Sequence, residues 1–534
     1  MSEGAAKKEQ KPRKFQAIRG TRDLLPPETA LWNRVEQAAH EVFATFGFGE
    51  IRVPIFEPTQ LFARAVGGET DIVSKEMYTM PDPETDHIYG LQRSLAEWAI
   101  APGNFEDADS FQGLTVSLLV FIVRAQQEKV LGFDFEEVGF EAVSEMTLAA
   151  GELKDLISKH TQSGDASAWN LVAEQVQRIK LANDRLTVGE DISLRPEATA
   201  SVCRAYIEHG MNSLPQPVKL YYMGPMFRRE RPQKGRYRQF YQIGAEVLGG
   251  SDAPAIDAEV IEMVMTFFDQ LELQGVQLDL NSIGCRECRP KYVELLRAEL
   301  LKVKDQLGPD SQRRIETNPL RVLDSKLESE QGIIATLPRI ADHLCGDCAK
   351  HYAEVKHQLQ LRGVIYRENW RLVRGLDYYM RTTFEITAQG LGSQDAVCGG
   401  GRYDGLVELL GGPPTKGIGF AIGEDRLILS LQESGKMPAQ QGRDIYIAWM
   451  GEKAQATAVR AAKGLRKAGF SVELPPVEQK FGKALGHADK LGAKYALILG
   501  DNEVTSGEWT LKTLADGSQT KFTEQDLLEH LRKK

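Results

Sequence analysis

The stretch 227–242, FRRERPQKGRYRQFYQ, concentrates positive charge in a chain whose formal net charge is −10. Six cations surround the single acid Glu230 there: Arg228, Arg229, Arg231, Lys234, Arg236 and Arg238. A run of charges is usually a solvated face. The forked guanidinium group of arginine can, however, grip phosphate oxygens in pairs. The adjoining strand places Phe240, Gln242 and Glu246 on one face of a sheet, and the two polar side chains are costly to place there unless something polar binds beside them. The stretch therefore favours a phosphate-bearing ligand over solvent.

The chain lacks the common glycine-rich phosphate loops. No GxxxxGK[ST] sequence occurs in it. The glycine-rich stretch CGGGRYDG (398–405) also fails the GxGxxG pattern, because Asp404 stands where the last glycine should be. A bound nucleotide would therefore have its phosphates held by arginine side chains.

Two CxxC pairs offer a second kind of chemistry. Cys285 and Cys288 form one pair, and Cys345 and Cys348 form the other. Paired CxxC knuckles are typical of a structural Cys₄ zinc site, although these two lie farther apart than in the usual zinc ribbon. The alternative is four reduced thiols in a helical subdomain. The isolated Cys203 and Cys398 are expected to be small core residues.

The composition indicates an ordinary soluble protein of several domains. The chain has 534 residues, of which 42% are hydrophobic and 26% charged. Its acidic balance restricts any nucleic-acid contact to local patches. The N-terminal residues do not form a signal peptide, and the apolar run 118–123 is too short to span a bilayer, so we expect no membrane contact. Six cysteines in a chain of this length do not form a secreted disulfide framework, which favours the cytoplasm.

A β-hairpin is predicted to carry the basic stretch. VKLYYMGPMFR and YRQFYQIGAEVLG flank it as two strands, with the cations at the tip. Because side chains alternate along a strand, Gln242, Gly244 and Glu246 should share one face. Upstream, residues 28–48 show a helical period that Gly47 and Gly49 end, and 51–58 (IRVPIFEP) is predicted to be a strand.

The remaining patterns divide the chain further. Residues 81–190 and 285–365 are mostly helical, whereas 368–387 and CGGGRYDG return to strand and turn. GIGFAIGEDRLILSLQ is predicted to be a strand leading into a helix. After a polar linker, strands and helices alternate to the C-terminus as in a compact α/β domain.

Several of these stretches resemble the class II aminoacyl-tRNA synthetases, and among them the histidyl-tRNA synthetases. The resemblance covers about residues 15–80 and 190–534. IRVPIFEP resembles the family's motif 1, FRRERPQKGRYRQF motif 2 and GIGFAIGEDRL motif 3. LVRGLDYYMRTTFEI and VCGGGRYDGL are similar to the histidine-specific members. Long stretches that agree in order are a stronger signal than any short motif.

The resemblance implies an α+β fold. It comprises a catalytic domain on a class II antiparallel sheet with helical insertions, and a C-terminal α/β anticodon-binding domain. With the patterns above it gives these predicted boundaries: a disordered tail, 1–14; the catalytic core, 15–80, 191–281 and 366–430; an additional helical insert, 81–190; a helical insertion domain, 282–365; a linker, 431–442; and the anticodon-binding domain, 443–534.

The resemblance also implies the activity of a histidine–tRNA ligase, which joins the histidine carboxylate to the α-phosphate of ATP, with Mg²⁺, and then transfers histidine to tRNA(His). Catalysis then needs preorganised cations at the phosphorus. By the family's pattern, Arg228 would hold the α-phosphate and Arg374 its far side, as the catalytic pair. Arg236 and Arg426 would take the outer phosphates, Phe240 would stack on adenine, and Glu230 would lie near the adenine edge.

Matching positions imply a histidine pocket. Glu197, Thr199 and Gln242 would accept from the α-ammonium group. Glu246 would meet one imidazole nitrogen and the Tyr379 hydroxyl the other, while Tyr403 lines the pocket. Tyr378 is assigned to the same pocket, although alternation along a strand would turn it the opposite way and make it a core residue. Such a polar site rejects apolar analogues, whose binding would leave its groups unpaired.

The tip of the hairpin would face the acceptor end of tRNA through Arg231, Gln233, Lys234 and Arg238, whereas Arg229 is left to solvent. The motif 1 resemblance implies a homodimer. One alternative is a non-catalytic relative, the synthetase-like regulatory subunit of ATP phosphoribosyltransferase, which typically lacks the C-terminal domain and loses catalytic residues. A pure RNA-binding protein is a second, but it would leave the polar pocket unexplained.

The sequence departs from the family at two places. Residues 81–190 stand where the family has a short turn, and an inert outgrowth, a lid and a tRNA contact are all open roles. In LRPEATAS, Ala198 replaces the usual glycine before the threonine. The methyl group would impair histidine binding if the position required a positive φ.

Overall fold

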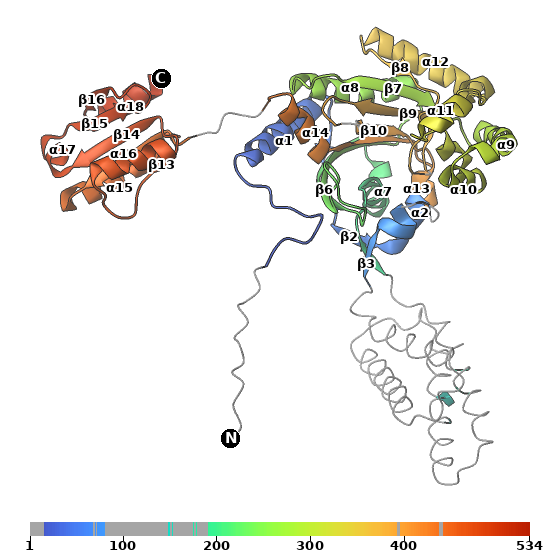
Figure 1. Cartoon of the computed structure of the whole chain (residues 1–534), viewed down its shortest axis with the longest axis horizontal. Helices are drawn as coiled ribbons and strands as arrows, with labels where there is room; N and C mark the ends of the chain where they lie inside the picture. Colours follow the sequence, from blue (N-terminus) through green and yellow to red (C-terminus); the bar gives the residue numbers. More distant parts are fainter. Residues whose placement is uncertain are drawn as a thin grey trace, which may run out of the picture. The chain divides into compact units, whose positions relative to one another are not determined.

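The computed structural model describes residues 15–67, 70, 72–80, 148–149, 152, 175, 178, 191–376, 378–391, 396–436 and 442–533. The chain divides into two compact units (Figure 1). One comprises Trp32–Lys436 with the residues before Leu25, and the other comprises Met437–Lys534 with Leu25–Leu31. The predicted tail 1–14 and, apart from isolated residues, the predicted insert 81–190 lie outside the described residues.

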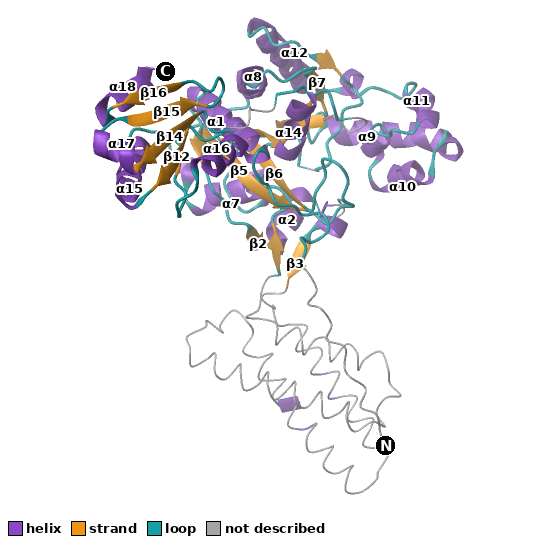
Figure 2. Ribbon diagram, turned by 60° about the vertical axis from the view of Figure 1, so that its left-hand side comes forward, coloured by secondary structure: helices purple, strands orange, loops and turns teal. Residues whose placement is uncertain are grey.

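An eight-stranded sheet forms the centre of the first unit as far as the structure describes it (Figure 2). Its strands run in the order β1 (Gly49–Glu50), β5 (Val218–Phe227), β6 (Gln239–Leu248), β11 (Gly417–Gly423), β10 (Ala396–Arg402), β9 (Met380–Thr387), β7 (Gln277–Ser282) and β8 (Arg367–Glu368). Neighbours from β5 to β7 are antiparallel, and only the short edge strands β1 and β8 pair in parallel. The predicted antiparallel sheet is thereby confirmed.

The predicted hairpin is also present. Strands β5 and β6 pair over ten residues each, from Val218 opposite Leu248 to Phe227 opposite Gln239. The odd-numbered Tyr241 packs on Trp32 of helix α1 (Glu28–Thr45), with ring centroids 5.2 Å apart. The even-numbered Gln242 and Glu246 therefore point to the opposite face of the sheet, as alternation predicts.

Helices cover the sheet because their apolar residues repeat at helical spacing and so form one apolar face, which packs against the sheet. Helix α1 ends before Gly47, and its Phe43 contacts Tyr221 of β5, Phe420 of β11 and Phe267 of α8 (Pro254–Gln270). The other face of the sheet carries helices with a core that includes Phe62, Tyr206 and Met226. These helices are α2 (Thr59–Val66), α7 (Thr199–Glu208) and α13 (Leu406–Leu409). Helix α14 (Glu424–Glu433) follows β11 directly, as predicted.

The predicted strand 51–58 is largely wrong. Only β2 (Phe56–Pro58) is a strand, and it pairs with β4 (Ile192–Leu194), which also pairs with β3 (Tyr78–Met80). Pro54 cannot donate a ladder hydrogen bond, and residues 51–55 run irregularly. Met80 lies opposite Ile192 in this small sheet, so the residues that flank 81–190 are neighbours at the end of a hairpin.

A helical region lies between β7 and β8. It contains α9 (Cys288–Lys302), α10 (Pro309–Thr317), α11 (Glu328–Ile334) and α12 (Gly346–Leu361). Short 3₁₀ turns connect these helices at Lys304–Gln306, Pro319–Val322 and Ile340–His343. Elsewhere in the first unit, a π-helix at Ile72–Glu76 follows α2 and a 3₁₀ turn at Met211–Ser213 follows α7. Tyr292, Leu296 and Ile315 belong to the buried core of this region.

The second unit is an α/β domain, as predicted. Its sheet has the order β13 (Val472–Glu473), β12 (Ile445–Met450), β14 (Tyr495–Gly500), β15 (Trp509–Thr513) and β16 (Gln519–Phe522). The helices are α15 (Glu452–Lys467), α16 (Phe481–Lys490), α17 (Asp501–Ser506) and α18 (Glu524–Lys533). Apolar clusters line both faces of the sheet. Across the described part of both units, no helix combines the length and the apolar character that crossing a bilayer requires.

Candidate functional site

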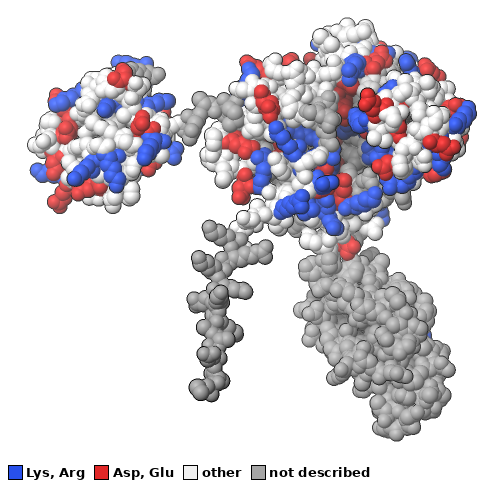
Figure 3. Space-filling model, in the orientation of Figure 1, with Lys and Arg blue, Asp and Glu red and all other residues white. Residues whose placement is uncertain are grey.

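A cavity of about 390 Å³ lies against the face of the sheet that carries Gln242 and Glu246. Figure 3 shows basic side chains gathered around a hollow in the larger unit. Every residue that the sequence assigned to ATP or histidine lines this cavity: Glu197, Thr199, Arg228, Glu230, Arg236, Phe240, Gln242, Glu246, Arg374, Tyr378, Tyr379, Tyr403 and Arg426. The cavity thus joins residues from the four strands β6, β9, β10 and β11 and from the beginnings of α7 and α14.

Glu246 is the centre of the acidic end. Its carboxyl oxygens accept hydrogen bonds from the Thr199 hydroxyl (2.8 Å) and the Tyr403 hydroxyl (2.5 Å). Burial raises the pKa of Glu246 to about 8, although these two donors act to lower it. The backbone of β11 leaves room for this side chain at Gly419, where a Cβ atom would lie 1.7 Å from Glu246 Oε2.

Glu197 already serves the protein itself. Its carboxylate accepts the backbone N–H groups of Thr199 (2.7 Å) and Ala200 (3.0 Å) at the start of α7. A carboxylate has about four acceptor positions, so it can still accept from a ligand. The intervening Ala198 has φ −112°, so this position does not require a positive φ in the chain. The methyl group is tolerated here without backbone strain.

Gln242 presents an unsatisfied acceptor. The residue is 9% exposed, and its side-chain oxygen Oε1 is buried without a hydrogen-bond partner in the protein. A buried polar atom without a partner is unfavourable by about 1–3 kcal/mol. Because Gln242 also lines the cavity, the geometry favours a ligand that brings an N–H donor to this oxygen.

Tyr378 and Tyr379 both line the cavity, so the expectation that alternation turns them opposite ways is wrong. They precede β9, which begins at Met380, and side chains outside a strand do not follow its alternation. Their ring centroids lie 4.7 Å apart, and Tyr378 meets Tyr403 edge-on at 5.7 Å. The three rings form one wall of the acidic end.

The opposite end of the cavity is basic. The Arg228 Nε group donates to the Pro196 carbonyl (3.0 Å), and its guanidinium lies 5.2 Å from the centre of the Phe240 ring. Arg236 pairs with Glu230 at 3.2 Å. Burial, and then the positive charge of Arg236, lower the pKa of Arg426. Cations that disfavour one another in a shared hollow are stabilised by an anion, which makes this end suitable for phosphate.

Arg374 reaches the same end from the other side. Its Nη1 group donates to Glu385 of β9 at 2.8 Å, and its Nε group is buried without a partner. The guanidinium lies against β10 at Gly399, where a Cβ atom would be 2.2 Å from Arg374 Nη2. A glycine is therefore needed at 399 for the arginine to occupy this place.

The residues assigned to tRNA lie at the tip of the hairpin and do not line the cavity. Backbone bonds between Gln233 and Arg236 (3.1 and 2.9 Å) close the tip, with Gly235 at φ +74°. Arg231, Gln233 and Lys234 are exposed, and Lys234 pairs with Glu433 at 2.9 Å. Arg238 instead lies along the N-terminal segment and donates to the Arg19 carbonyl (3.3 Å). Arg229 is exposed, as expected for a side chain left to solvent.

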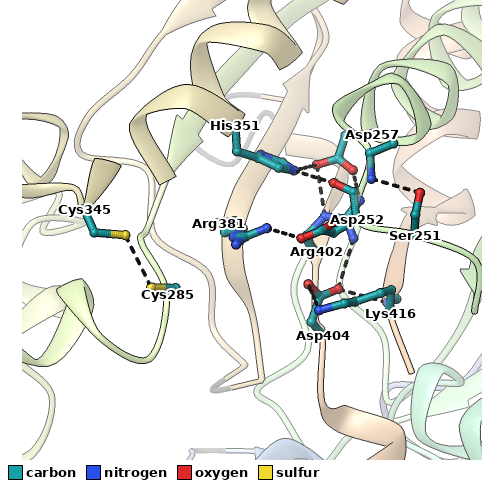
Figure 4. A network of polar contacts seen from close by, with 12 residues as sticks. Ser251, Asp252, Asp257, Cys285, Cys345, His351, Arg381, Arg402, Asp404 and Lys416 are labelled. Carbon is teal, nitrogen blue, oxygen red and sulfur yellow. Dashed lines mark hydrogen bonds and ion pairs between the residues drawn. The ribbon is translucent and has the colours of Figure 1, made fainter. Parts of the chain in front are cut away.

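A buried polar network fixes the turn that carries Tyr403 (Figure 4). Arg402 is 1% exposed; it pairs with Asp257 of α8 and donates to Asp404 at 3.0 Å. Asp404 also accepts the Gly417 N–H group at 3.1 Å. These bonds attach the turn to α8 and β11, and so hold the Tyr403 hydroxyl at Glu246.

The four CxxC cysteines come together outside this cavity. Their sulfur atoms lie within 4.8 Å of one another, with Cys285 Sγ 3.7 Å from Cys288 Sγ and 3.8 Å from Cys345 Sγ. A tetrahedral zinc ion with Zn–S bonds of about 2.3 Å places its sulfurs about 3.8 Å apart. Backbone N–H groups donate to the Cys288 sulfur (3.2 Å) and to the Cys285 sulfur (3.4 Å). The donor set fits a tetrathiolate metal site. Cys203 and Cys398 are buried apart from this cluster, and Cys398 lines the cavity.

Glu385 and Arg321 are among the cavity-lining residues that sequence reasoning missed. Glu385, the partner of Arg374, could have been found, because a carboxylate inside the strand MRTTFEIT needs a reason to be there. Arg321 lines the basic end and lies 3.4 Å from where a Cβ atom of Gly375 would be. It comes from the helical region, and nothing in its local pattern separates it from a surface arginine.

Two family models match the chain, one in the first unit and one in the second. Residues 170–427 match the family model described as histidyl-tRNA synthetase, and residues 444–534 match that of the anticodon binding domain. The histidine–tRNA ligase of Solibacter usitatus is 44% identical over 518 residues, covering 97% of this chain and 99% of the relative. That of Koribacter versatilis is 44% identical over 522 residues, covering 97% and 96%.

Among solved structures, the apo histidyl-tRNA synthetase of S. aureus matches with a TM-score of 0.65 and 30% identity, covering 97% of this chain and 99% of that one. Both the first unit, with its cavity, and the second unit fall within these matches. From its sequence and its fold, this chain belongs to the histidyl-tRNA synthetase family.

Proposed function

We propose that this chain is a histidine–tRNA ligase that works in two steps in the cavity described above. First, an oxygen of the histidine carboxylate attacks the α-phosphorus of ATP. The bond from this phosphorus to the bridging oxygen breaks, and pyrophosphate leaves with the bonding pair. Second, a hydroxyl group at the 3′ end of tRNA attacks the carbonyl carbon of the histidyl-adenylate, losing its proton, and AMP leaves.

One observation carries the proposal: a single cavity is acidic and polar at one end and basic at the other. Histidyl-adenylate has the same division, with an ammonium group and an imidazole at one end and a phosphate at the other. The unpartnered oxygen of Gln242 lies at the cavity, where an α-ammonium group would satisfy it. Glu197 and Thr199 supply further oxygen acceptors for the same ammonium group.

At the acidic end, Glu246 accepts from one imidazole nitrogen and the Tyr379 hydroxyl meets the other. Tyr378 and Tyr403 enclose the ring. The bonds from Thr199 and Tyr403 hold the Glu246 carboxyl in one orientation before histidine arrives, which favours a ligand that fits this orientation.

At the basic end, Arg228 and Arg374 hold the α-phosphate from opposite sides, and their charges stabilise the negative charge that builds on the phosphorus. Arg236 and Arg426 take the outer phosphates of ATP, which enters with Mg²⁺. Phe240, already stacked under the Arg228 guanidinium, provides the face for adenine, and Glu230 lies near the adenine edge.

Several partners complete the proposal. The exposed Arg231, Gln233 and Lys234 face the acceptor end of tRNA(His), with Arg238 at the base of the loop, while the second unit binds the anticodon. The chain acts as a homodimer in the cytoplasm. The exposed apolar side chains of Ile55 (44%) and Phe56 (58%) in the motif 1 stretch support a dimer contact.

The proposal includes one structural zinc ion. Cys285, Cys288, Cys345 and Cys348 would bind it as thiolates, and the two distances from the Cys285 sulfur, 3.7 and 3.8 Å, are those expected in a tetrahedron. Zinc would take no part in the two chemical steps, because none of the four sulfurs lines the cavity. Metal analysis of purified protein tests it, and a zinc stoichiometry near zero rules it out.

The alternative, a regulatory subunit of ATP phosphoribosyltransferase, accounts for the chain less well. That class typically loses catalytic residues and the C-terminal domain. This chain keeps Arg228, Arg374 and Arg426 at one cavity and has the second unit. The 44% identity to ligases along nearly the whole chain also favours the enzyme.

Transfer of labelled histidine to tRNA tests the proposed function. Purified chain with ATP, Mg²⁺ and tRNA(His) should form acid-precipitable histidyl-tRNA, and omission of ATP should abolish it. A folded chain that charges no tRNA with histidine contradicts the proposal.

A further inference from the structure

We infer that the four-cysteine cluster, with its metal bound, holds in place the tyrosine wall of the cavity and so sets the affinity for histidine. The tyrosine wall is defined as Tyr378 and Tyr379, and the cysteine knuckle as residues 283–289. The inference rests on the proposed function, because it concerns the control of the same pocket. It gives a metal outside the cavity a role in substrate binding.

The first connection runs through the backbone. The Ile283 N–H group donates to the Arg381 carbonyl (2.8 Å), and the Arg381 N–H group donates to the Gly284 carbonyl (2.7 Å). These bonds extend the pairing of β7 with β9 beyond its last partners, Ser282 and Thr382. They join the residues just before Cys285 to a position two residues after Tyr379.

The second connection is an arginine that spans from the knuckle to the wall. Arg289 follows Cys288 directly, and its Nη1 group donates to the Tyr379 carbonyl at 2.7 Å. A second arginine of the knuckle, Arg286, lies against the turn after Tyr403, where a Cβ atom on Gly405 would be 2.4 Å from its Nη2. The tyrosine wall and the turn that carries Tyr403 both border the acidic end of the cavity. Both are therefore in contact with the cysteine knuckle.

A space beside the tyrosine wall increases the importance of these contacts. A second cavity, of about 440 Å³, lies between Cys285, Arg286 and Arg289 on one side and Tyr378 and Tyr379 on the other. Side chains that border an empty space lose the packing contacts that would fix them. Both rings pack against apolar cores on their other sides, so the hydrogen bonds to the knuckle support the wall on the side where packing is incomplete.

The metal fixes the knuckle in turn. Gly284 has φ +72°, and a Cβ atom there would lie 2.8 Å from Cys288 Sγ, so the loop is folded tightly around the sulfurs. Cys345 and Cys348 come from the start of α12, on a different element. A metal ion bonded to all four sulfurs joins the knuckle to α12, and its loss leaves only weak thiol contacts between them.

Calorimetric titration of histidine without ATP tests the inference. The zinc-loaded chain is compared with the chain after chelation under reducing conditions, and a separate titration measures the affinity for ATP. Metal removal should weaken histidine binding about tenfold, the lower end of the effect of losing a supporting contact around a metal site. The affinity for ATP should fall much less, because the knuckle contacts none of the arginines at the basic end, and of these arginines Arg374 lies over the Tyr379 ring, at 5.9 Å.

A variant that keeps all four cysteines provides an independent arm. Arg289→Ala removes the bond to Tyr379 and should weaken histidine binding about tenfold at full zinc content. The matched control is Arg297→Ala on the same helix, because Arg297 also donates to a backbone carbonyl, that of Ile315 at 3.2 Å, but away from the cavity. The control should bind histidine as the unmodified chain does.

The outcomes separate the alternatives. Unchanged histidine affinity after metal removal, with the circular dichroism spectrum retained, overturns the inference, and so does an equal loss of histidine and ATP affinity. If the stripped chain unfolds, Arg289→Ala decides alone, and an affinity equal to that of Arg297→Ala overturns the inference. Failure of the intact, zinc-loaded chain to bind histidine refutes the proposed function instead.

Discussion

The ionisation of Glu246 should couple histidine binding to pH. Burial raises the pKa of this carboxyl to about 8, so in the empty pocket it carries a proton at neutral pH. In the proposed complex it accepts from an imidazole N–H group and must be a carboxylate. Binding therefore releases the proton, and affinity rises as the pH increases toward 8.

The size of the effect follows from the pKa. At pH 7 a group with a pKa of about 8 is roughly 90% protonated, and ionising it costs about 1.4 kcal/mol, which is about a tenfold loss of affinity. Histidine should therefore bind about tenfold more tightly at pH 8 than near pH 6.5, and release about 0.9 proton at pH 7 through this group.

Titration calorimetry in buffers of different ionisation enthalpy measures both quantities. Glu246→Gln is the matched control, because the amide keeps the size of the side chain but cannot ionise in this range. Its oxygen can accept one of the two bonds from Thr199 and Tyr403, and its NH₂ group can donate to the other hydroxyl oxygen. The variant should bind histidine weakly and release only the protons that come from free histidine itself. Proton release that is the same in both proteins, or an affinity of the unmodified chain that is flat with pH, refutes this reasoning.

Three further predictions concern the basic end and the insert. Arg374→Ala should lower the rate of histidine-dependent pyrophosphate–ATP exchange by about 10²–10³-fold at an unchanged thermal midpoint. The control Arg371→Ala, which loses a bond to Gln331 (2.8 Å), should keep the exchange rate. Exchange that persists in Arg374→Ala excludes the role assigned to this arginine. Gly399→Ala should cause a similar loss, since its Cβ atom would displace Arg374, and normal exchange contradicts the close approach. Replacing 81–190 with a short turn should leave charging of tRNA unchanged, because Met80 and Ile192 already face each other. Charging or tRNA affinity that is lost assigns the insert an active role.

Where a residue sits in a regular strand, its place could be predicted from the sequence. The shared face of Gln242 and Glu246 follows from alternation in β6, and the hairpin follows from two strand patterns around a polar tip. The α/β pattern of the second unit was equally readable, because each strand and helix there has its own periodicity.

The arrangement of residues outside regular elements could not be predicted. Tyr378 and Tyr379 share a wall because they precede β9, and no periodicity applies to such positions. Residues 51–55 have the composition of a strand, but pairing depends on distant neighbours that local propensity does not report. Arg321 reaches the cavity from the helical region through the tertiary fold alone.

Contacts between distant segments also depend on the fold. The sequence shows two CxxC pairs but not that their sulfurs meet, nor that Arg289 extends from the first pair to Tyr379. Glycines show the same limit: Gly399 and Gly419 have no local signature, yet their missing side chains make room for Arg374 and Glu246.

The central claim is that histidine is activated by ATP in the cavity of the first unit. Pyrophosphate–ATP exchange by the purified chain, measured with each standard amino acid in turn, tests it most directly. Exchange should depend on L-histidine and should be lost in Arg228→Ala as well as in Glu246→Ala. Exchange with no amino acid, or exchange with histidine that both variants retain, would contradict the account.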